Sequence, residues 1–273
     1  MDTVIIRGGG DLATGVAYKL YKAGYKVIIL EIDKPLTVRR SVSFSEAVYE
    51  KEVTVEGIKA ILAKDKEDIH GILDLGAIPV YLDEKGIIIG DIKPLAVVDA
   101  IIAKKNLGTK QSMAPITIGI GPGFEAGKDV NVVIESNRGP NLGKIIYRGK
   151  ASENTSIPGE IMGHKEDRVL RAPCNGIVKS FYEIGDIVDE GEVICKVGDE
   201  KLLAPFKGLL RGMIKEGLYV KKGLKIGDID PRCIKEYAHL ISDKAKIIGD
   251  SVVEAIQYLK YEKSTYRKCA IAR

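Results

Sequence analysis

The glycine-rich stretch near the start of the chain has the residue types of a phosphate-binding loop. Gly8, Gly9 and Gly10 follow a short apolar run, and Ala13 completes the spacing G-x-G-x-x-A. In such a loop the glycines permit a tight turn and let backbone amides approach a phosphate, and the small fourth residue lets a helix pack on the strand. Glu31 stands 21 residues after Gly10, where an acid commonly binds a ribose. We therefore expect the three glycines and Glu31 to bind a nucleotide-like ligand.

Asp11 complicates this interpretation of the loop. A carboxylate beside a phosphate cradle repels an anion, unless it caps the following helix or contacts a metal, and capping is the more ordinary explanation. The loop also has a purely structural interpretation, in which the glycines only let the helix approach the sheet closely. The sequence leaves both interpretations of the loop open.

A second set of polar residues follows the apolar run at 95–98. Pro94 and the two valines of this run favour a strand over a helix, which places Asp99 at the carboxyl end of the strand. Lys104 and Asn106 follow shortly afterwards. Ligands of open α/β sheets bind beyond the carboxyl ends of the strands, so we expect these three residues to line the same cleft as the first glycine loop.

A third set surrounds the stretch GIGPGFEAGKDVNVVIES. Gly121 and Gly123 lie between two apolar runs that are too close for a crossover helix, so this stretch is not a second dinucleotide fingerprint. It is either a tight connection or a backbone-lined ligand cradle. Glu135, Asn137 and Arg138 follow, and such a charged fork suits a phosphate or a carboxylate. An exposed, solvated arginine is an equally good explanation.

The elements that would position these residues follow from the apolar periodicity. Strands at 4–6 and 27–30 with a helix at 13–22 between them form a β-α-β unit. The spacing of Ile58, Ile61 and Leu62 predicts an amphipathic helix, and the apolar residues on both sides of 84–86 predict a hairpin.

An internal repeat occupies the later part of the chain. Residues 172–198 and 204–230 align with a constant offset of 32, which matches Ala-Pro pairs, turn glycines and apolar positions. Two copies of short strands and turns predict a small pseudo-symmetric β module with one shared core. The pattern resembles the biotinyl/lipoyl hammerhead domain. The hairpin KVGDEKLL lacks the setting of a modified lysine, and Lys201 lies past its turn, so we expect no biotin or lipoate.

The predicted fold class is α/β: a Rossmann-like amino-terminal domain, a small all-β hammerhead-like module and a helical carboxyl-terminal segment. We expect the first domain at 1–168, the β module at 169–231 and the helical segment, packed on the first domain, at 232–273.

Composition and charge narrow the classes of function. A chain of 273 residues with 42 basic and 38 acidic residues has a net charge of +4 and no long block of like charge, so we expect no nucleic-acid binding. We also expect no membrane span and no leader, hence a cytoplasmic protein. Scattered histidines and the four cysteines, Cys174, Cys195, Cys233 and Cys269, indicate no metal site. A redox role for Cys174 or Cys269 is left open.

Several motifs together resemble one known family. RGGGDLATGVAYKLYKAG, VRRSVSFSEAVYE, VVDAIIAKKNLGT, MAPITIGIGPGFEAGKDVNVVIESNRGPNLGKII and RAPCNGIV look like the YqeB-type accessory proteins of selenium-dependent molybdenum hydroxylase systems. The middle motif is similar to one in the XdhC-type proteins, which bind molybdenum cofactor. Pro140 stands where that pattern has a histidine after the Arg-Gly pair, so no ligand role is carried over to it.

The resemblance implies a maturation role with a client molybdenum hydroxylase as partner. It also implies a small anionic cofactor, molybdopterin or its dinucleotide, for which a glycine loop at a helix amino terminus is suited. The same fingerprint permits an NAD(P)-dependent oxidoreductase, although no proton-transfer residue accompanies it. A non-catalytic scaffold is the other alternative. We assign no catalytic residue, and the sequence leaves open whether the chain forms a homo-oligomer.

Overall fold

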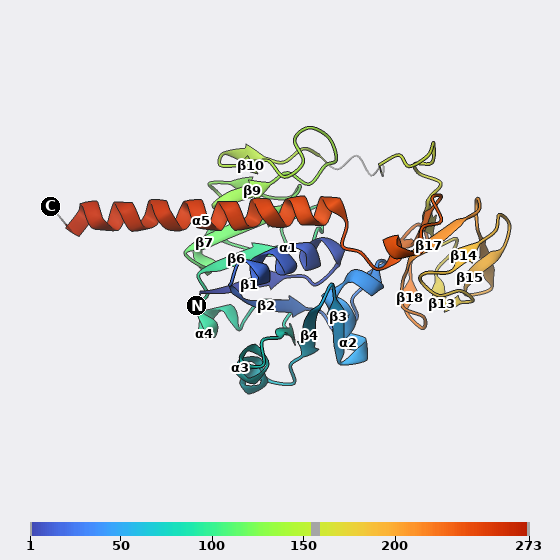
Figure 1. Cartoon of the computed structure of the whole chain (residues 1–273), viewed down its shortest axis with the longest axis horizontal. Coiled ribbons are helices and arrows are strands. Elements are labelled where there is room, and N and C mark those ends of the chain that lie inside the picture. Colours follow the sequence, from blue (N-terminus) through green and yellow to red (C-terminus); the bar gives the residue numbers. More distant parts are fainter. Residues whose placement is uncertain (1, 154–158, 272–273) are drawn as a thin grey trace.

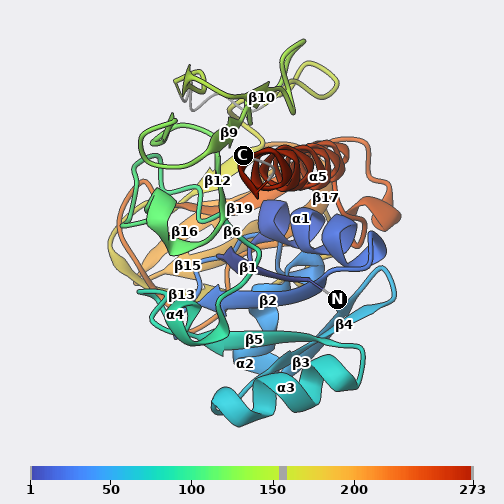
Figure 2. The same cartoon turned by 90° about the vertical axis from the view of Figure 1, so that its left-hand side faces the viewer.

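A computed structural model describes residues 2–153 and 159–271 of the chain, with side chains up to residue 264 in the last helix. A nine-stranded sheet occupies its first part, in the order β10-β9-β7-β6-β1-β2-β5-β4-β3 (Figures 1 and 2). The strands of this sheet are β1 Thr3–Arg7, β2 Lys26–Glu31, β3 Glu52–Val55, β4 Ile58–Leu62, β5 Ile78–Leu82, β6 Ala96–Asp99, β7 Ile116–Ile120, β9 Val132–Ile134 and β10 Ile145–Ile146. The helices are α1 Asp11–Lys22, α2 Ala47–Glu50, α3 Lys66–Asp74, α4 Ile89–Ile92 and α5 Asp243–Ile271.

Helices cover both faces of this sheet, and strand alternation assigns the side chains to the two faces. Val4 and Ile6 of β1 belong to the core under α1 and α5, whereas Ile5 belongs to the core under α3 and α4. All three side chains are fully buried. Because both neighbours of β1 are parallel to it, its residues have the continuous apolar pattern of a strand buried on two sides.

Helices α1 and α5 lie side by side, although they are far apart in the sequence (Figure 1). A Cβ atom on Gly15 would lie 2.6 Å from Cβ of Ala245, and one on Gly249 would lie 2.6 Å from the backbone oxygen of Gly15. Residue 15 thus faces 245, and Lys19, one turn farther along α1, lies 2.7 Å from the Cβ position of Gly249. The helices therefore run in parallel and both begin at the same end. The two glycines permit this close approach.

The glycine contact between the helices makes a testable prediction. We expect Gly249→Ala to lower the free energy of unfolding by about 1–3 kcal/mol, because the added methyl group overlaps backbone that cannot move aside cheaply. Gly71→Ala is the matched control, since Gly71 lies in α3 with no atom within 4 Å of its Cβ position. That change should stabilise by about 0.5–1 kcal/mol through helix propensity. Urea unfolding measures both effects, and equal effects of the two changes would contradict the close packing.

Two local predictions were wrong. Residues 58–62 form strand β4, which pairs with β3 as an antiparallel hairpin rather than forming an amphipathic helix. Glu56 and Gly57 both have positive φ, which is the turn conformation that joins two strands directly. The residues after the turn at 84–86 form the short helix α4 instead of a second hairpin strand, and β5 pairs with β2 and β4 in parallel.

The Rossmann-like part of the predicted fold class also needs correction. The sheet is mixed, not parallel throughout, because β3 and β10 are antiparallel to their neighbours at its two edges. Alternation of strands with helices stops after β6: a loop with positive φ at Ile102 and Lys104 and a single short 3-10 turn joins β6 to β7. The strand-to-strand connection from β7 to β9 contains the two-residue strand β8 Glu125–Ala126, which pairs with β11 Gly149–Lys150.

Two antiparallel sheets of four strands form the second part, in the orders β12-β19-β17-β14 and β16-β15-β13-β18. These strands are β12 Val169–Arg171, β13 Gly176–Ser180, β14 Ile187–Val188, β15 Val193–Val197, β16 Glu200–Leu203, β17 Gly208–Met213, β18 Tyr219–Val220 and β19 Lys225–Asp230. The strand starts follow the offset of 32 closely, and both halves contribute to one buried core. The sequence repeat is therefore a structural repeat.

The hammerhead-like description of this β module is corrected to a pair of four-stranded antiparallel sheets, in which each sheet contains strands from both halves of the repeat. Strand β14 pairs with β17, and β18 pairs with β13, so the halves interlock rather than stand as separate hairpins. The Gly-rich pattern that suggested a hammerhead marks the turns: Gly185, Gly191, Gly217 and Gly223 all have positive φ. Such a pattern specifies turn positions and not the arrangement of the sheets.

The chain returns to the first sheet after the β module. Helix α5 contacts β7, β9 and α1, and its far end extends beyond the sheet (Figure 1). Within the described residues, the structure contains no helix with the length and apolarity that a membrane crossing requires.

Candidate anion-binding site

The first glycine loop is closed by its own chain. The backbone N–H of Gly8 donates to the carbonyl of Leu30 at 2.8 Å, and that of Gly9 donates to Oε2 of Glu31 at 2.7 Å. A Cβ atom on Gly8 would lie 3.1 Å from the carbonyl oxygen of Ala100, so φ of +95° and close packing both require glycine there. The amides of Gly8 and Gly9, which were expected to bind a phosphate, thus already have partners.

Glu31 supports this loop. Its second oxygen accepts from the backbone N–H of Ile32 at 2.9 Å. Burial raises the pKa of Glu31, although the two amide hydrogen bonds oppose the shift. Glu31 and Gly8 also line a cavity of about 350 Å³ beyond the ends of β1 and β2. The carboxylate therefore links the loop to the end of β2, and it lines this cavity.

Asp99 and Asn106 hold the loop after β6. Asp99 is 2% exposed and accepts from the hydroxyl of Thr109 at 2.5 Å, and Nη1 of Arg7 lies 3.4 Å from the same carboxylate oxygen. The side chain of Asn106 accepts from the amides of Gly108 and Thr109, both at 2.8 Å. Both residues are fully engaged in shaping this segment.

The second glycine loop is tightly packed. A Cβ atom on Gly121 would lie 2.5 Å from Oγ of Ser136, and one on Gly123 would lie 2.7 Å from the backbone of Lys105, so both positions exclude any side chain. Lys104 lies beside this loop and lines an open cavity of about 520 Å³ with Gly123. Among the alternatives for this loop, the contacts favour a tight connection.

Glu135 also binds its own backbone. Its two oxygens accept from the N–H groups of Asn137 at 2.8 Å and Ser152 at 2.7 Å. Burial alone would raise the pKa of Glu135, but these hydrogen bonds outweigh it and lower the pKa. Glu135 thus fixes the turn that carries Asn137 and Arg138.

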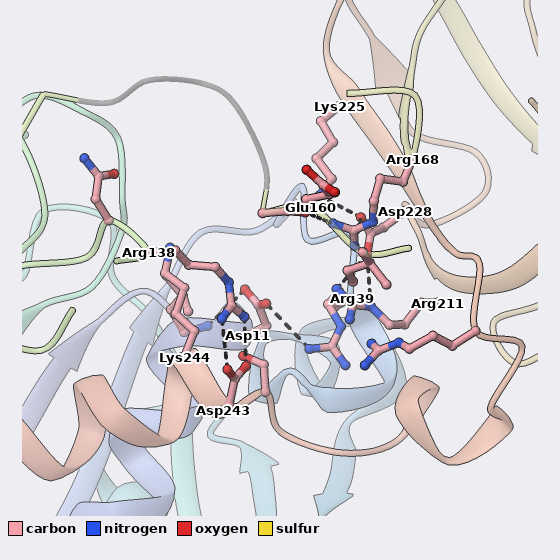
Figure 3. A pocket seen from close by; sticks show the side chains of 16 residues that line it. Asp11, Arg39, Arg138, Glu160, Arg168, Arg211, Lys225, Asp228, Asp243 and Lys244 are labelled. Atoms are coloured by element: carbon pink, nitrogen blue, oxygen red, sulfur yellow. Dashed lines mark hydrogen bonds and ion pairs between the residues drawn. The ribbon is translucent and has the colours of Figure 1, made fainter. Parts of the chain in front are cut away.

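The remaining predicted residues, Asp11, Asn137 and Arg138, meet in a large polar cavity between the first sheet and the β module (Figure 3). Its volume is about 870 Å³. Seven cationic side chains line it, against four anionic ones. The cations are Arg39, Arg138, Arg168, Arg211, Lys225, Arg232 and Lys244, and the anions are Asp11, Glu160, Asp228 and Asp243. An excess of positive charge in a cavity of this size favours an anionic small molecule.

Both long parallel helices begin at this cavity. Asp11 and Leu12 of α1 and the first residues of α5 line it. Helix α5 is capped by Ser242, whose Oγ accepts from the N–H of Ala245 at 3.2 Å, whereas Gly10 caps α1 without a side-chain hydrogen bond. Asp11 accepts from the N–H of Leu12 at 3.0 Å, which satisfies one donor of the first turn. Two converging helix amino termini add to the positive potential of the cavity.

A set of arginines from three parts of the chain surrounds the buried carboxylate of Asp228. Arg211 contacts Asp228 at 2.8 Å, and Arg168 and Lys225 lie 3.4 and 3.5 Å from it. Asp228 is 2% exposed, and the cations lower its pKa although burial opposes the shift. Asp230 beside it pairs with Arg211 and Arg232, so two carboxylates share four cations in this cluster.

Arg39 joins this set from the segment after β2. It donates to the carbonyls of Tyr237 and Leu240, both at 3.0 Å, and Nη1 lies 3.9 Å from Asp11. Burial lowers the pKa of Arg39, and the neighbouring charge of Arg211 lowers it further. The guanidinium is therefore held among like charges at the junction of the sheet and the β module.

Three cationic side chains of the cavity keep donors without partners. Arg39 and Arg168 are 6% and 4% exposed, and Nε of each has no hydrogen-bond partner. No hydrogen bond or ion pair is present at Nζ of Lys244 within the described part of the chain. Burial lowers the pKa of Lys244. Buried donors such as the Nε atoms of Arg39 and Arg168 normally have partners, so these two groups indicate the place of an acceptor-rich ligand, and the partly buried Lys244 lines the same cavity.

Sequence reasoning missed most of this cavity. Only Asp11, Asn137 and Arg138 were predicted, because the other charged lining residues come from separate places: the segment after β2, residues 160–168, the β module and the residue after it, and the start of α5. One signal was present: Asp228 and Asp230 alternate with apolar residues in KIGDID, which places carboxylates on a buried strand face. Such carboxylates require cations nearby.

The His, Cys, Asp and Glu side chains of the described residues are distributed without a metal-binding cluster. Over residues 2–153 and 159–264, no three metal-binding side chains of the kinds His, Cys, Asp and Glu come together. Cys174, Cys195 and Cys233 are free thiols, and Cys269 lies outside the residues whose side chains are described.

The thiols make a further testable prediction. Burial raises the pKa of Cys195 to about 12, whereas Cys174 and Cys233 are partly exposed. Since the thiolate is the reactive form, we expect iodoacetamide near pH 8 to label Cys174 and Cys233 in the folded protein and to spare Cys195 until the chain unfolds. Peptide mass spectrometry reads each site separately. Early labelling of Cys195 would contradict its burial.

Comparison with known proteins gives one strong sequence match. No family model matches the chain. The chain is 50% identical over 259 residues to the uncharacterized protein YqeB of Escherichia coli strain K12, which covers 95% of this chain and 48% of that protein. The chain therefore spans about half the length of this curated relative. The motifs predicted a resemblance to YqeB-type proteins, and the matching relative bears that name.

Solved structures give only weak matches. They include a succinylglutamate desuccinylase from Silicibacter sp. TM1040, an aspartoacylase family protein from Mesorhizobium loti and a succinylglutamate desuccinylase/aspartoacylase from Rhodobacter sphaeroides. Identities are 11%, 12% and 13%, and TM-scores are 0.25, 0.26 and 0.27. The alignments cover 84% of this chain and 84–85% of those chains. At these TM-scores we transfer neither fold nor activity.

The functional prediction drawn from the resemblance requires correction. The relative that carries the expected name is described as uncharacterized, so it gives no support to a role with molybdenum enzymes. These findings support neither a maturation role nor the two alternatives, a dehydrogenase and a scaffold. The function must instead be argued from the cavity.

Proposed function

We propose that this chain binds a small polyanionic molecule, with phosphate as its main anionic group, in the cavity between the first sheet and the β module. The observation that carries this proposal is the excess of cations over anions among the lining residues at the point where two helices begin. Helix amino termini and arginine forks both favour phosphate oxygens. The lining residues come from both parts of the chain, so the ligand would touch both.

The cavity also supports a statement about ligand size. A volume of about 870 Å³ falls in the range of sites for nucleotide-sized molecules and far exceeds a single inorganic ion. Molybdopterin, its dinucleotide and NAD(P) all carry phosphate, and each remains a prediction for the cofactor. Our proposal places the phosphate in this cavity and not on the closed glycine loop at Gly8 to Gly10.

Isothermal titration with inorganic pyrophosphate and with ADP tests the proposal. We expect both to bind, with an affinity that falls steeply as the salt concentration rises, because the attraction is electrostatic. Citrate, which carries carboxylates in place of phosphates, serves as the comparison ligand. Absence of binding by both phosphate compounds at low salt would overturn the proposal, and stronger binding of citrate would shift the ligand class to carboxylates.

A further inference from the structure

We infer that the cavity holds two separate anion subsites, and that its ligand is a molecule with two anionic groups, one in each subsite. This inference rests on the proposed function and specifies the class of ligand. The helix-end subsite comprises Arg138, Asp243 and Lys244 with the start of α1. The arginine subsite comprises Arg39, Arg168, Arg211 and Lys225 around Asp228. Figure 3 shows the two sets on opposite sides of the cavity.

The helix-end subsite has one available cation. Arg138 forms a two-pronged ion pair with Asp243, with distances of 2.9 and 2.8 Å, so its charge is largely neutralised. Lys244 is the next residue along α5 and has no such pair within the described residues. The start of α1, which lacks a side-chain cap on Gly10, faces the same space. One anionic group would satisfy Lys244 and the first turn of α1 together.

The arginine subsite carries the larger excess of charge. Arg39 and Arg168 are both more than nine-tenths buried, and Nε of each is without a partner. Arg211 shares its contacts between Asp228 at 2.8 Å and Asp230 at 3.4 Å. Cations buried side by side repel each other, so an anion in this subsite would remove an unfavourable interaction as well as form hydrogen bonds.

Asp11 separates the two subsites. Its carboxylate lies 3.9 Å from Arg39 and belongs to the first turn of α1, so it stands between the arginines and Lys244 (Figure 3). A single compact anion placed against Asp11 would be repelled. Two anionic groups on one molecule can instead occupy the positive regions on either side of it, joined by an uncharged or hydroxyl-bearing linker.

Counting bound phosphate tests the inference directly. Equilibrium dialysis of the whole chain with radioactive inorganic phosphate should give two equivalents per chain. Lys244→Met should weaken one of them by about tenfold to a hundredfold, the effect of losing one charge-assisted hydrogen bond. Arg211→Met should weaken the phosphate bound in the arginine subsite. Lys225→Met changes a more exposed residue of the same subsite, so it is less disruptive to the fold and serves as the second variant. Lys222→Met, exposed and outside the cavity, is the matched control.

The outcomes separate this inference from the proposed function. Two equivalents, with each variant weakening a different one, support two subsites. Fructose 1,6-bisphosphate, which carries two phosphates on a hydroxyl-bearing linker, should then displace both at one molecule per chain. A single equivalent, or two that weaken together in every variant, would overturn the inference and leave an anion cavity with one site. No bound phosphate and no bound fructose 1,6-bisphosphate would overturn the proposed function itself.

Discussion

Lys244→Met should weaken anion binding at the helix-end subsite without destabilising the fold. The ammonium group of Lys244 lines the cavity, has no ion pair within the described residues, and sits where burial lowers its pKa. Removing it takes away a cation that the ligand needs and that the fold does not. We expect the dissociation constant for pyrophosphate to rise about 10-fold to 100-fold, and the free energy of unfolding to stay the same or increase.

Lys246→Met is the matched control for this prediction. Lys246 lies one half-turn farther along α5, pairs with Glu56 at 2.9 Å and does not line the cavity. Its loss should lower the free energy of unfolding by no more than about 1 kcal/mol, as for a partly exposed ion pair, and leave binding unchanged. Titration and urea unfolding of both variants give the comparison. If Lys244→Met binds pyrophosphate as tightly as the natural chain, the assignment of Lys244 to an anion subsite is wrong.

The parts of the fold that the sequence predicted are those where local pattern suffices. Strand β1, helix α1 and strand β2 follow from apolar periodicity and a glycine turn within 30 residues. The 32-residue repeat predicted a symmetric β module, and its strands keep that offset. Failure came where two patterns coincided: Ile58, Ile61 and Leu62 fit a helix, but the turn at Glu56 and Gly57 directs them into a strand.

The binding cavity could not be predicted from the sequence for a different reason. Arg39, Arg168 and Lys244 are separated by long stretches of sequence, and only the return of α5 onto the first sheet brings them to one place. Sequence reasoning placed the ligand at the first glycine loop because the pattern of that loop lies within a few consecutive residues. In the structure its amides bind Leu30 and Glu31, while the start of the helix that it introduces, at Asp11, borders the cavity.

Asp228→Asn should destabilise the protein more than any other change considered. The carboxylate is 2% exposed and lies between Arg211, Arg168 and Lys225. Neutralising it leaves buried guanidinium groups without their counterion, which typically costs about 3–5 kcal/mol. Asp250→Asn, which removes a surface ion pair between Lys19 and the 62% exposed Asp250, should cost no more than about 1 kcal/mol. Urea unfolding at pH 7 measures both changes.

The effect of Asp228 should depend on pH in one direction. Burial opposes its ionisation, but the surrounding cations prevail and lower its pKa in the folded state. A group with a lowered pKa binds fewer protons when folded, so its contribution is complete above the unfolded pKa, about 4, and is lost as the pH falls below that value. The gap in unfolding free energy between the natural chain and Asp228→Asn should therefore be widest near neutral pH and narrow in acid. A gap that stays constant from pH 7 down to acid unfolding would show that Asp228 is not the anion that balances this cluster.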